Sequence, residues 1–268
     1  MNRKVVLVTG GSSGIGKAIG IYLTGKGFKV YGTSRNLKKQ EGFKEFELLE
    51  LDVTKSDTIS AAINSIIERE GKLDVLINNA GVGITGPIEE TPITEISKAF
   101  DTNLNGPIRM IQTVLPQMRS QKKGLIINIT SIAGNMGLPY RGIYSASKGA
   151  LSLVTEALRM ETKDFGIQIA DLAPGDFATN IAAGRYHAPA NNNSSYPSYS
   201  KVLDMINTDV DAAQDPIVVA KKVHSIIIKN NPKVHYKVGV FLQKFSLFLK
   251  SVLPDTLYER LLLNHYKL

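Results

Sequence analysis

Short apolar runs alternate with longer amphipathic segments along most of the chain. The apolar runs are rich in Val, Ile and Leu, which is typical of strands buried on both faces of a parallel sheet. The segments between them place apolar residues three and four positions apart, which predicts helices. Strands are expected at 4–9, 29–34, 46–53, 73–79, 124–131, 167–174 and 233–239, and helices at 57–70, 92–119, 144–163 and 215–229.

This alternation predicts an α/β fold. Strands that alternate with helices assemble into a parallel sheet with helices on both faces, joined by right-handed crossovers. A chain of 268 residues is long enough for one such domain. We therefore expect a doubly wound parallel sheet over residues 1–240, with an apolar helical extension of the same domain at 241–268.

Two regions depart from the alternation. Residues 175–215 form a long segment rich in Gly, Ala, Asn, Ser and Tyr, which is compatible with a substrate loop and equally with a plain surface loop. The tail places Phe241, Phe245, Phe248 and Val252 at helical spacing. Such a helix can pack on its own domain, cover the pocket or a subunit interface, or lie on a membrane surface with its lysines flanking the apolar face.

Composition narrows the class of protein. The chain has no cysteine, which excludes a disulfide framework and a thiolate metal cluster and suits a cytoplasmic location. Its four histidines are widely spaced, so no metal site is expected. The net charge is +8, but the lysines are scattered and no zinc-finger or homeodomain spacing is present, so we expect no nucleic-acid partner. The charge fits a phosphate-bearing ligand or an anionic membrane surface better.

Neither a signal peptide nor a spanning helix is expected. The apolar run that follows the basic start MNRK ends at glycines and is too short for a signal sequence. No apolar stretch approaches the roughly 18 residues that cross a bilayer as a helix. Contact with a membrane, if the tail makes one, would therefore be peripheral.

A glycine-rich turn directly follows the first expected strand. The stretch TGGSSGIG (9–16) runs into a helical segment, and strand, glycine turn and helix in this order are what a dinucleotide pyrophosphate site requires. Free N–H groups at the helix start face the phosphates. A glycine-rich turn without a ligand is the plainer alternative, although such glycines are entropically costly. The residues expected to bind here are Gly10, Ser12, Ser13, Gly14, Ile15 and Gly16.

The end of the second expected strand distinguishes NADP(H) from NAD(H). An acidic residue there would bind the ribose 2′-hydroxyl, whereas a basic one accommodates a 2′-phosphate. The chain has Ser34 and Arg35 and no acid, and the planar guanidinium suits phosphate. We therefore predict NADP(H) in preference to NAD(H), the alternative being a solvated arginine after a strand. Asp52 and Val53, at the end of the third strand, are expected near the adenine.

Six ordered motifs resemble the classical short-chain dehydrogenase/reductase family. They are TGGSSGIG, NNAG (78–81), Asn103 in DTNLNG, Ser131 in NITSIAG, YSASK (144–148) and PG (174–175). The resemblance extends from about residue 4 to 180 and, more loosely, over 215–239. It implies a Rossmann-type fold, an NAD(P)-dependent oxidoreductase, and cofactor contacts from Asn79, Ala80, Gly81, Tyr144, Lys148, Pro174, Gly175 and Thr179. After PG the chain has DFA (176–178), where the family often has an apolar β-branched residue, and this departure bears on the shape of the loop.

Tyr144 and Lys148 lie one helical turn apart, so their side chains point to the same face. Reduction of a ketone leaves an alkoxide that must gain a proton, and a nearby cation lowers the pKa of a phenol toward the range in which it can donate one. Ser131 would hydrogen-bond the substrate oxygen and hold it beside the phenol. The resemblance implies that Asn103 joins a water-linked proton relay through Lys148. Taken singly, Ser131 is also compatible with a helix cap and Asn103 with a turn.

The substrate region is expected to have apolar walls with hydroxyl edges. Its candidate contacts are Gly137, Tyr140 and Ile181, together with Ser131 and Tyr144. In this it is similar to family members that reduce bulky lipophilic ketones, such as steroid, retinoid or 3-ketosphinganine reductases. The leading hypothesis is an NADPH-dependent carbonyl reductase, reversible as an alcohol dehydrogenase. Alternatives are a non-catalytic NADP(H)-binding sensor, a 3-oxoacyl-type reductase and a scaffold protein. The family is usually dimeric or tetrameric, so a homodimer or homotetramer is expected.

Overall fold

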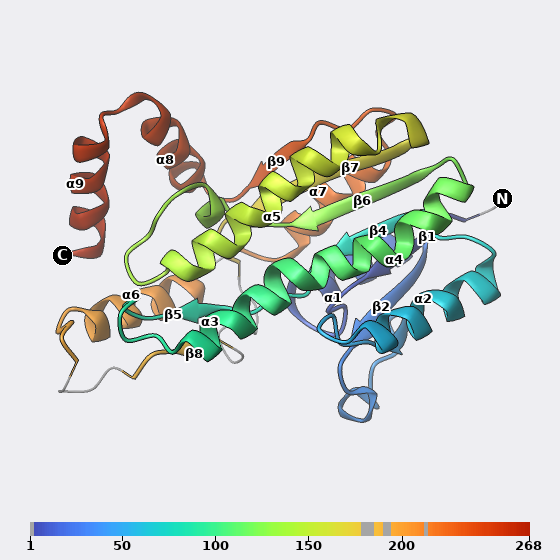
Figure 1. Cartoon of the computed structure of the whole chain (residues 1–268), viewed down its shortest axis with the longest axis horizontal. Helices are drawn as coiled ribbons and strands as arrows, with labels where there is room; N and C mark the ends of the chain where they lie inside the picture. The colour runs from blue at the N-terminus through green and yellow to red at the C-terminus, as the bar shows by residue number, and fades with distance from the viewer. Residues whose placement is uncertain (1–2, 178–184, 190–193, 212–213) are drawn as a thin grey trace.

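A parallel sheet of seven strands forms the centre of the molecule (Figure 1). The computed structural model describes residues 3–177, 185–189, 194–211 and 214–268. The strand order is β3-β2-β1-β4-β6-β7-β9, and each strand pairs in parallel with its neighbours. The strands are β1 Val5–Val8, β2 Lys29–Ser34, β3 Glu47–Glu50, β4 Val75–Asn78, β6 Gly124–Ile129, β7 Ile167–Pro174 and β9 His235–Val238.

Helices cover both faces of this sheet, as the alternating pattern predicts. Side chains of α2, α4 and α5 pack on one face, and side chains of α1 and α7 pack on the other. The helices are α1 Gly14–Gly25, α2 Ser56–Glu70, α3 Ile93–Phe100, α4 Gly106–Ser120, α5 Gly142–Glu161, α6 Tyr199–Asp211, α7 Ile217–Ile227, α8 Phe241–Val252 and α9 Asp255–Tyr266. Short turns of helix lie at η1 Leu37–Gln40, η2 Asp101–Asn105, η3 Ile132–Asn135 and η4 Lys163–Phe165.

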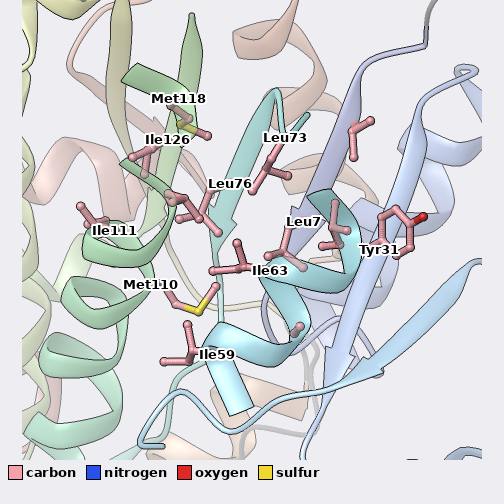
Figure 2. Packing of buried hydrophobic residues seen from close by; sticks show 14 of the residues in the cluster. Leu7, Tyr31, Ile59, Ile63, Leu73, Leu76, Met110, Ile111, Met118 and Ile126 are labelled. Atoms are coloured by element: carbon pink, nitrogen blue, oxygen red, sulfur yellow. The ribbon is translucent and has the colours of Figure 1, made fainter. Parts of the chain in front are cut away.

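The apolar runs are buried because successive side chains of a strand point to opposite faces of the sheet. In β1, Val5 and Leu7 belong to the core under α2 and α4, whereas Val6 and Val8 belong to the core under α1 and α7. Figure 2 shows the first of these cores, in which side chains of α2 and α4 lie over Leu7 and its neighbours. The doubly wound α/β fold expected from the sequence is confirmed.

The expected helix 92–119 is interrupted by η2, a π-helical turn. The turn separates α3 from α4, and the N–H of Gly106 bonds to the carbonyl of Asp101, five residues earlier. Pro107 follows at the start of α4. Proline has no N–H to donate to the carbonyl four residues earlier, which here is that of Asn103, so regular α-helical bonding stops at this place.

The segment 175–215 contains elements that the sequence analysis did not anticipate. Tyr186–His187 forms β8, which pairs with β5, Ile84–Thr85. Residues Tyr199–Asp211 form α6, and its buried Tyr199, Val202 and Ile206 lie three and four positions apart. The interpretation of this whole segment as a loop is therefore corrected, because an amphipathic helix packs within it.

The tail forms two helices, α8 and α9, joined by a short bend, and the carboxyl end of α9 lies toward the amino-terminal end of α5 (Figure 1). One side packs on the domain: Leu247 contacts the core around Ile132 and Met136, and Tyr258 is buried with its hydroxyl 3.2 Å from the sulfur of Met136. The other side exposes Phe241, Phe245 and Phe248, whose rings stack on one another. Among the described residues, no helix combines the length and the apolar character needed to cross a membrane.

Candidate active site

The expected catalytic residues meet at the carboxyl ends of the central strands. Open α/β sheets bind their ligands at this edge, where the strand order reverses. Ser131 follows β6, Pro174 ends β7, and Tyr144 and Lys148 come from the first turns of α5. These residues line a cavity together with Ile15, Asn79, Gly81 and Gly175. Ile15, Asn79, Gly81 and Val82 also line a larger trough, so the two spaces adjoin.

The amino-terminal turn has the shape of a phosphate cradle. Gly10 and Gly14 adopt φ angles of +64° and +52°, a conformation that glycine tolerates best. A Cβ on Gly16 would lie 2.3 Å from the carbonyl oxygen of Gly10, so no other residue fits there without movement. Helix α1 begins at Gly14 and its N-cap Ser13 makes no side-chain capping bond. The first N–H groups of α1 therefore remain available to phosphate oxygens, and the cradle fits the pyrophosphate of a dinucleotide.

Thr9 ties this cradle to the NNAG segment. Its hydroxyl oxygen accepts hydrogen bonds from the N–H groups of Asn79 and Ala80, each at 2.9 Å. The side-chain amide of Asn79 donates to the carbonyl of Thr9, also at 2.9 Å. The floor of the trough and the glycine turn are thus held as one unit. Thr9 was not among the predicted site residues, although its place at the end of β1, directly before the glycines, is visible in the sequence.

The far end of the trough carries positive charge. Ser34, Arg35, Asp52 and Val53 line it as predicted, and so does Lys39 of η1, which the sequence analysis missed. Burial acts to raise the pKa of Asp52, but hydrogen bonds from the N–H and hydroxyl of Thr54 and the charge of Arg35 hold that pKa below its usual value. Two cations beside one ionised carboxylate leave this end suited to a phosphate group.

Ser131 and Tyr144 lie together in the smaller cavity. Ser131 is the N-cap of η3, with its hydroxyl oxygen accepting from the N–H of Ala133 at 3.2 Å, so it is a helix cap and a pocket residue at once. Burial raises the pKa of Tyr144, while the charge of Arg141 and a hydrogen bond with Ser131 act to lower it. The largest lowering influence on the phenol is therefore Arg141 rather than Lys148, which differs from the expectation.

Lys148 and Asn103 lie deeper in the protein than Ser131 and Tyr144. The ammonium of Lys148 donates to the carbonyl of Ile129 at 3.0 Å, and burial lowers its pKa to about 8. Asn103 is fully buried in η2, and its side chain exchanges two hydrogen bonds with the main chain of Val82, at 2.8 and 2.9 Å. It also donates to the hydroxyl of Ser147 at 3.1 Å. The Asn103 side chain thus fixes the loop after NNAG against α5.

Three charged residues complete the wall of the cavity: Arg141, Asp176 and Arg185. Asp176 begins the DFA stretch that departs from the family pattern, whereas the sequence analysis did not name the two arginines. The guanidinium carbon of Arg141 lies 5.8 Å from the centre of the Tyr144 ring. A guanidinium nitrogen of Arg141 is 3.7 Å from one carboxylate oxygen of Asp176. Motif spacing gives no signal for these residues because they lie outside the matched motifs.

Both tail helices reach this charged wall. The side-chain amide of Gln243, in α8, donates to Asp176 at 2.8 Å, and the side chain of Tyr266, in α9, hydrogen-bonds Arg141. The tail therefore packs on its own domain and also supports the pocket. Its sequence showed the apolar spacing but not these polar contacts.

Some predicted substrate contacts lie elsewhere. Gly137 is exposed and does not line the cavity. Tyr140 also lies off the cavity, in a ring cluster with Tyr196 and Tyr199. Thr179 and Ile181 fall outside the described residues. Within the described part of the chain, no group of His, Cys, Asp and Glu side chains is arranged to hold a metal ion.

Comparisons with known proteins identify a family and a fold. The family model for short chain dehydrogenases matches residues 4–190. A 3-ketodihydrosphingosine reductase of Bacteroides thetaiotaomicron is 38% identical over 261 residues, covering 97% of this chain and 96% of the relative. A solved short-chain dehydrogenase from Streptomyces avermitilis superposes with a TM-score of 0.81 at 30% identity, over 98% of this chain and 97% of that one. ElxO with NADP bound superposes with a TM-score of 0.72 at 29% identity, over 88% and 97% of the two chains.

Proposed function

This chain belongs to the short-chain dehydrogenase family and is an NAD(P)-dependent oxidoreductase acting on CH–OH groups, and from that premise we propose that it reduces a lipophilic ketone with NADPH. The reaction is reversible, so the same site oxidises the corresponding secondary alcohol. The observation that carries this proposal is the convergence of Ser131, Tyr144 and Lys148 in one cavity that opens into the phosphate cradle. The cradle would hold the cofactor's pyrophosphate, and the bound nicotinamide would supply the hydride.

Tyr144 is the proposed proton donor. Its phenol would give a proton to the carbonyl oxygen as that oxygen gains charge, and the Ser131 hydroxyl would hold the oxygen in place. The Arg141 and Arg185 guanidinium groups support this role because their charges lower a phenol pKa that burial raises. Positive charge near the phenol also stabilises the phenolate left after proton transfer.

Lys148 and Asn103 are proposed to return the proton. Lys148, whose pKa is about 8, can carry or release a proton near neutral pH, and it would also bind the nicotinamide ribose. The side chain of Asn103 is engaged with Val82 and Ser147. Any relay contact of Asn103 would therefore use its main-chain carbonyl, to which Pro107 cannot donate.

NADP(H) is proposed in preference to NAD(H). Arg35 and Lys39 at the far end of the trough support this choice, because with an unesterified 2′-hydroxyl the carboxylate of Asp52 would be the one anion facing two cations among the lining residues that the structure describes. Solved structures similar to this chain hold either NADP or NAD, so the family alone does not decide the preference.

For the ketone, a bulky lipophilic molecule is proposed, of the steroid, retinoid or 3-ketosphinganine kind. The similarity to a 3-ketodihydrosphingosine reductase over nearly the whole chain supports the last of these, and Ile84, Val82 and Phe177 supply apolar lining. A 3-oxoacyl-type reductase is the alternative within the family. A non-catalytic NADP(H) sensor is the alternative in another class, and it is disfavoured because a sensor has no use for a proton path.

The substitution Tyr144→Phe tests the proposal. We expect kcat on the best substrate of a ketone panel to fall by about 10²- to 10⁴-fold, because the proton donor is removed. NADPH affinity, measured by fluorescence titration, should stay within about threefold of the native value because the cradle is untouched. Turnover that survives in Tyr144→Phe would overturn the mechanism, and NADPH binding with no turnover of any ketone by the native chain would favour the sensor.

The finer expectations on assembly and location are also proposed. The protein is proposed to be a homodimer or homotetramer, and light scattering during gel filtration would measure the mass of the assembly. It is also proposed to lie in the cytoplasm. Peripheral membrane contact through the exposed rings of Phe241, Phe245 and Phe248 is testable by flotation with vesicles, comparing the full chain with a variant in which these residues are serine. Equal flotation of the two would remove the membrane proposal.

A further inference from the structure

The cavity at Tyr144 carries an excess of positive charge. Arg141, Lys148 and Arg185 line it, and Asp176 is the carboxylate among the described lining residues. Asp176 is already engaged, because it accepts a hydrogen bond from Gln243 at 2.8 Å and lies 3.7 Å from Arg141. One carboxylate therefore faces three cations, and a ligand that brings negative charge would restore the balance.

Arg185 has a guanidinium nitrogen without a partner. Its Nη1 atom is buried and makes no hydrogen bond to any part of the chain that the structure describes. Neighbouring groups that act on the guanidinium are Arg141, which repels it, and Tyr144, Asp176 and Tyr199. Burial and the charge of Arg141 hold the pKa of Arg185 below its usual value. A buried donor left unpaired destabilises the fold, more so when it is charged, and is typical of a site completed by a ligand.

Gly83 allows Arg185 to take this position. A Cβ on Gly83 would lie 2.8 Å from both Cγ and Nε of Arg185, so the arginine stem rests directly on the main chain after NNAG. That segment and Tyr144 border the same cavity. The guanidinium is therefore held at the reaction site by its packing and is not a solvated surface group.

We propose that Arg185 binds an oxyanion of the substrate, such as a carboxylate, placed close to the reacting carbonyl. The inference rests on the proposed ketone reduction, and within that reaction it selects keto acids with an apolar body in place of the steroid, retinoid or 3-ketosphinganine kind. A planar guanidinium binds a carboxylate through two parallel hydrogen bonds, which a neutral ketone cannot supply. A cationic amino ketone would add a fourth positive charge to the cavity.

Matched substrates provide the test. A series of medium-chain 3- and 4-keto acids is compared with the methyl esters and with amino ketones of the same length, by NADPH oxidation. We expect the native chain to prefer acid over ester by about 10- to 100-fold in kcat/KM, the effect of a charge-assisted hydrogen bond. In Arg185→Met this preference should fall to nearly one, because kcat/KM for the acids should fall far more than kcat/KM for the esters. Arg185→Lys keeps the charge but loses the planar guanidinium, so it should retain part of the preference for acids over esters.

Controls separate this proposal from its alternatives. Arg119→Met, on the exposed side of α4, should leave the acid preference unchanged. Equal use of acids and esters by the native chain, or a preference for the amino ketones, overturns the proposal. So does an Arg185→Met variant that loses NADPH affinity and affects acids and esters equally, because Arg185 would then be a cofactor contact.

Ligand binding without turnover distinguishes failure of this proposal from failure of the proposed function. Thermal shifts are recorded for the native chain and Arg185→Met with the acids and with the esters, in the presence of NADP⁺. Acid-specific stabilisation that Arg185→Met abolishes supports the anion site, even if no ketone is reduced. Lack of any difference between acids and esters counts against the site, even if ketones are reduced.

Discussion

The cofactor trough and the substrate wall lie side by side but are built in different ways. The trough is made of short motifs held by local bonds: Thr9, directly before the glycine turn, and NNAG are joined by hydrogen bonds that each pair a main-chain group with the side chain of Thr9 or Asn79. The wall is made of side chains from distant parts of the chain, since Asp176 meets Gln243, and Arg141 meets Tyr266. A site of the first kind is rigid and shared by a family, whereas a site of the second kind can change one side chain at a time.

If the trough depends on backbone fit, a side chain added in its glycine turn should have the largest effect on NADPH affinity. In Gly16→Val the new side chain would start 2.3 Å from the carbonyl oxygen of Gly10. We expect NADPH affinity to fall by at least about 100-fold, with a loss of stability from the same overlap. Fluorescence titration and thermal melts measure both. Gly25→Ala is the matched control, since a Cβ there meets nothing within 4 Å at the end of the same helix. If Gly16→Val bound NADPH with native affinity, the trough would not depend on backbone fit.

Lys148 lies where the two regions meet, and its burial predicts a pH dependence. Its pKa is lowered from 10.5 to about 8, so the folded state holds fewer protons than the unfolded state between these values. Stability of the native chain should therefore rise with pH across that window and carry the full cost of the buried ammonium below pH 8.

Lys148→Met removes the ionisable group. At pH 7 this variant should be more stable than the native chain by up to about 3 kcal/mol, and the difference should shrink toward pH 10.5. Urea unfolding at several pH values measures it. A stability difference that does not depend on pH would mean that the ammonium is solvated in the fold.

The 2′-phosphate end of the trough depends on side chains, so it should respond to single charges. Arg35→Asp should shift the ratio of kcat/KM for NADPH over NADH by about 10- to 100-fold toward NADH, because the carboxylate repels a phosphate and accepts a hydrogen bond from a hydroxyl. Lys39→Met should shift it less. Lys38→Met is the control, as Lys38 does not line the trough. An unchanged ratio in Arg35→Asp would assign the discrimination to another residue.

The contrast between the locally built trough and the wall of distant side chains also decides what the sequence could predict. The strands, the cradle from Gly10 to Gly16 and the pair Tyr144–Lys148 depend on local spacing, and each could be predicted. Arg185 could not, since its position beside Tyr144 results from the fold of segments far apart in the chain. Arg141 lies three residues before Tyr144, at the N-cap of α5, but no family motif marks it.

Two errors have physical causes. Helix α6 was missed because a stretch rich in Asn and Ser precedes it, although its own buried positions Tyr199, Val202 and Ile206 have helical spacing. Gly137 was expected in the substrate region as part of the segment 137–140, but η3 and the chain after it carry it to the surface. Nearness along the chain predicts nearness in space only within a turn or a helix.

The smallest expected effect comes from the tail. In Gln243→Ala the hydrogen bond to Asp176 is lost, and the space that the side chain fills next to Gly175 opens. We expect KM for the ketone to rise a few-fold and NADPH affinity to stay unchanged, because one polar contact contributes about 1 kcal/mol. Lys244→Ala, at the neighbouring exposed position, should change neither. A loss of NADPH affinity in Gln243→Ala would contradict the comparison, since it would show that the wall also supports the trough.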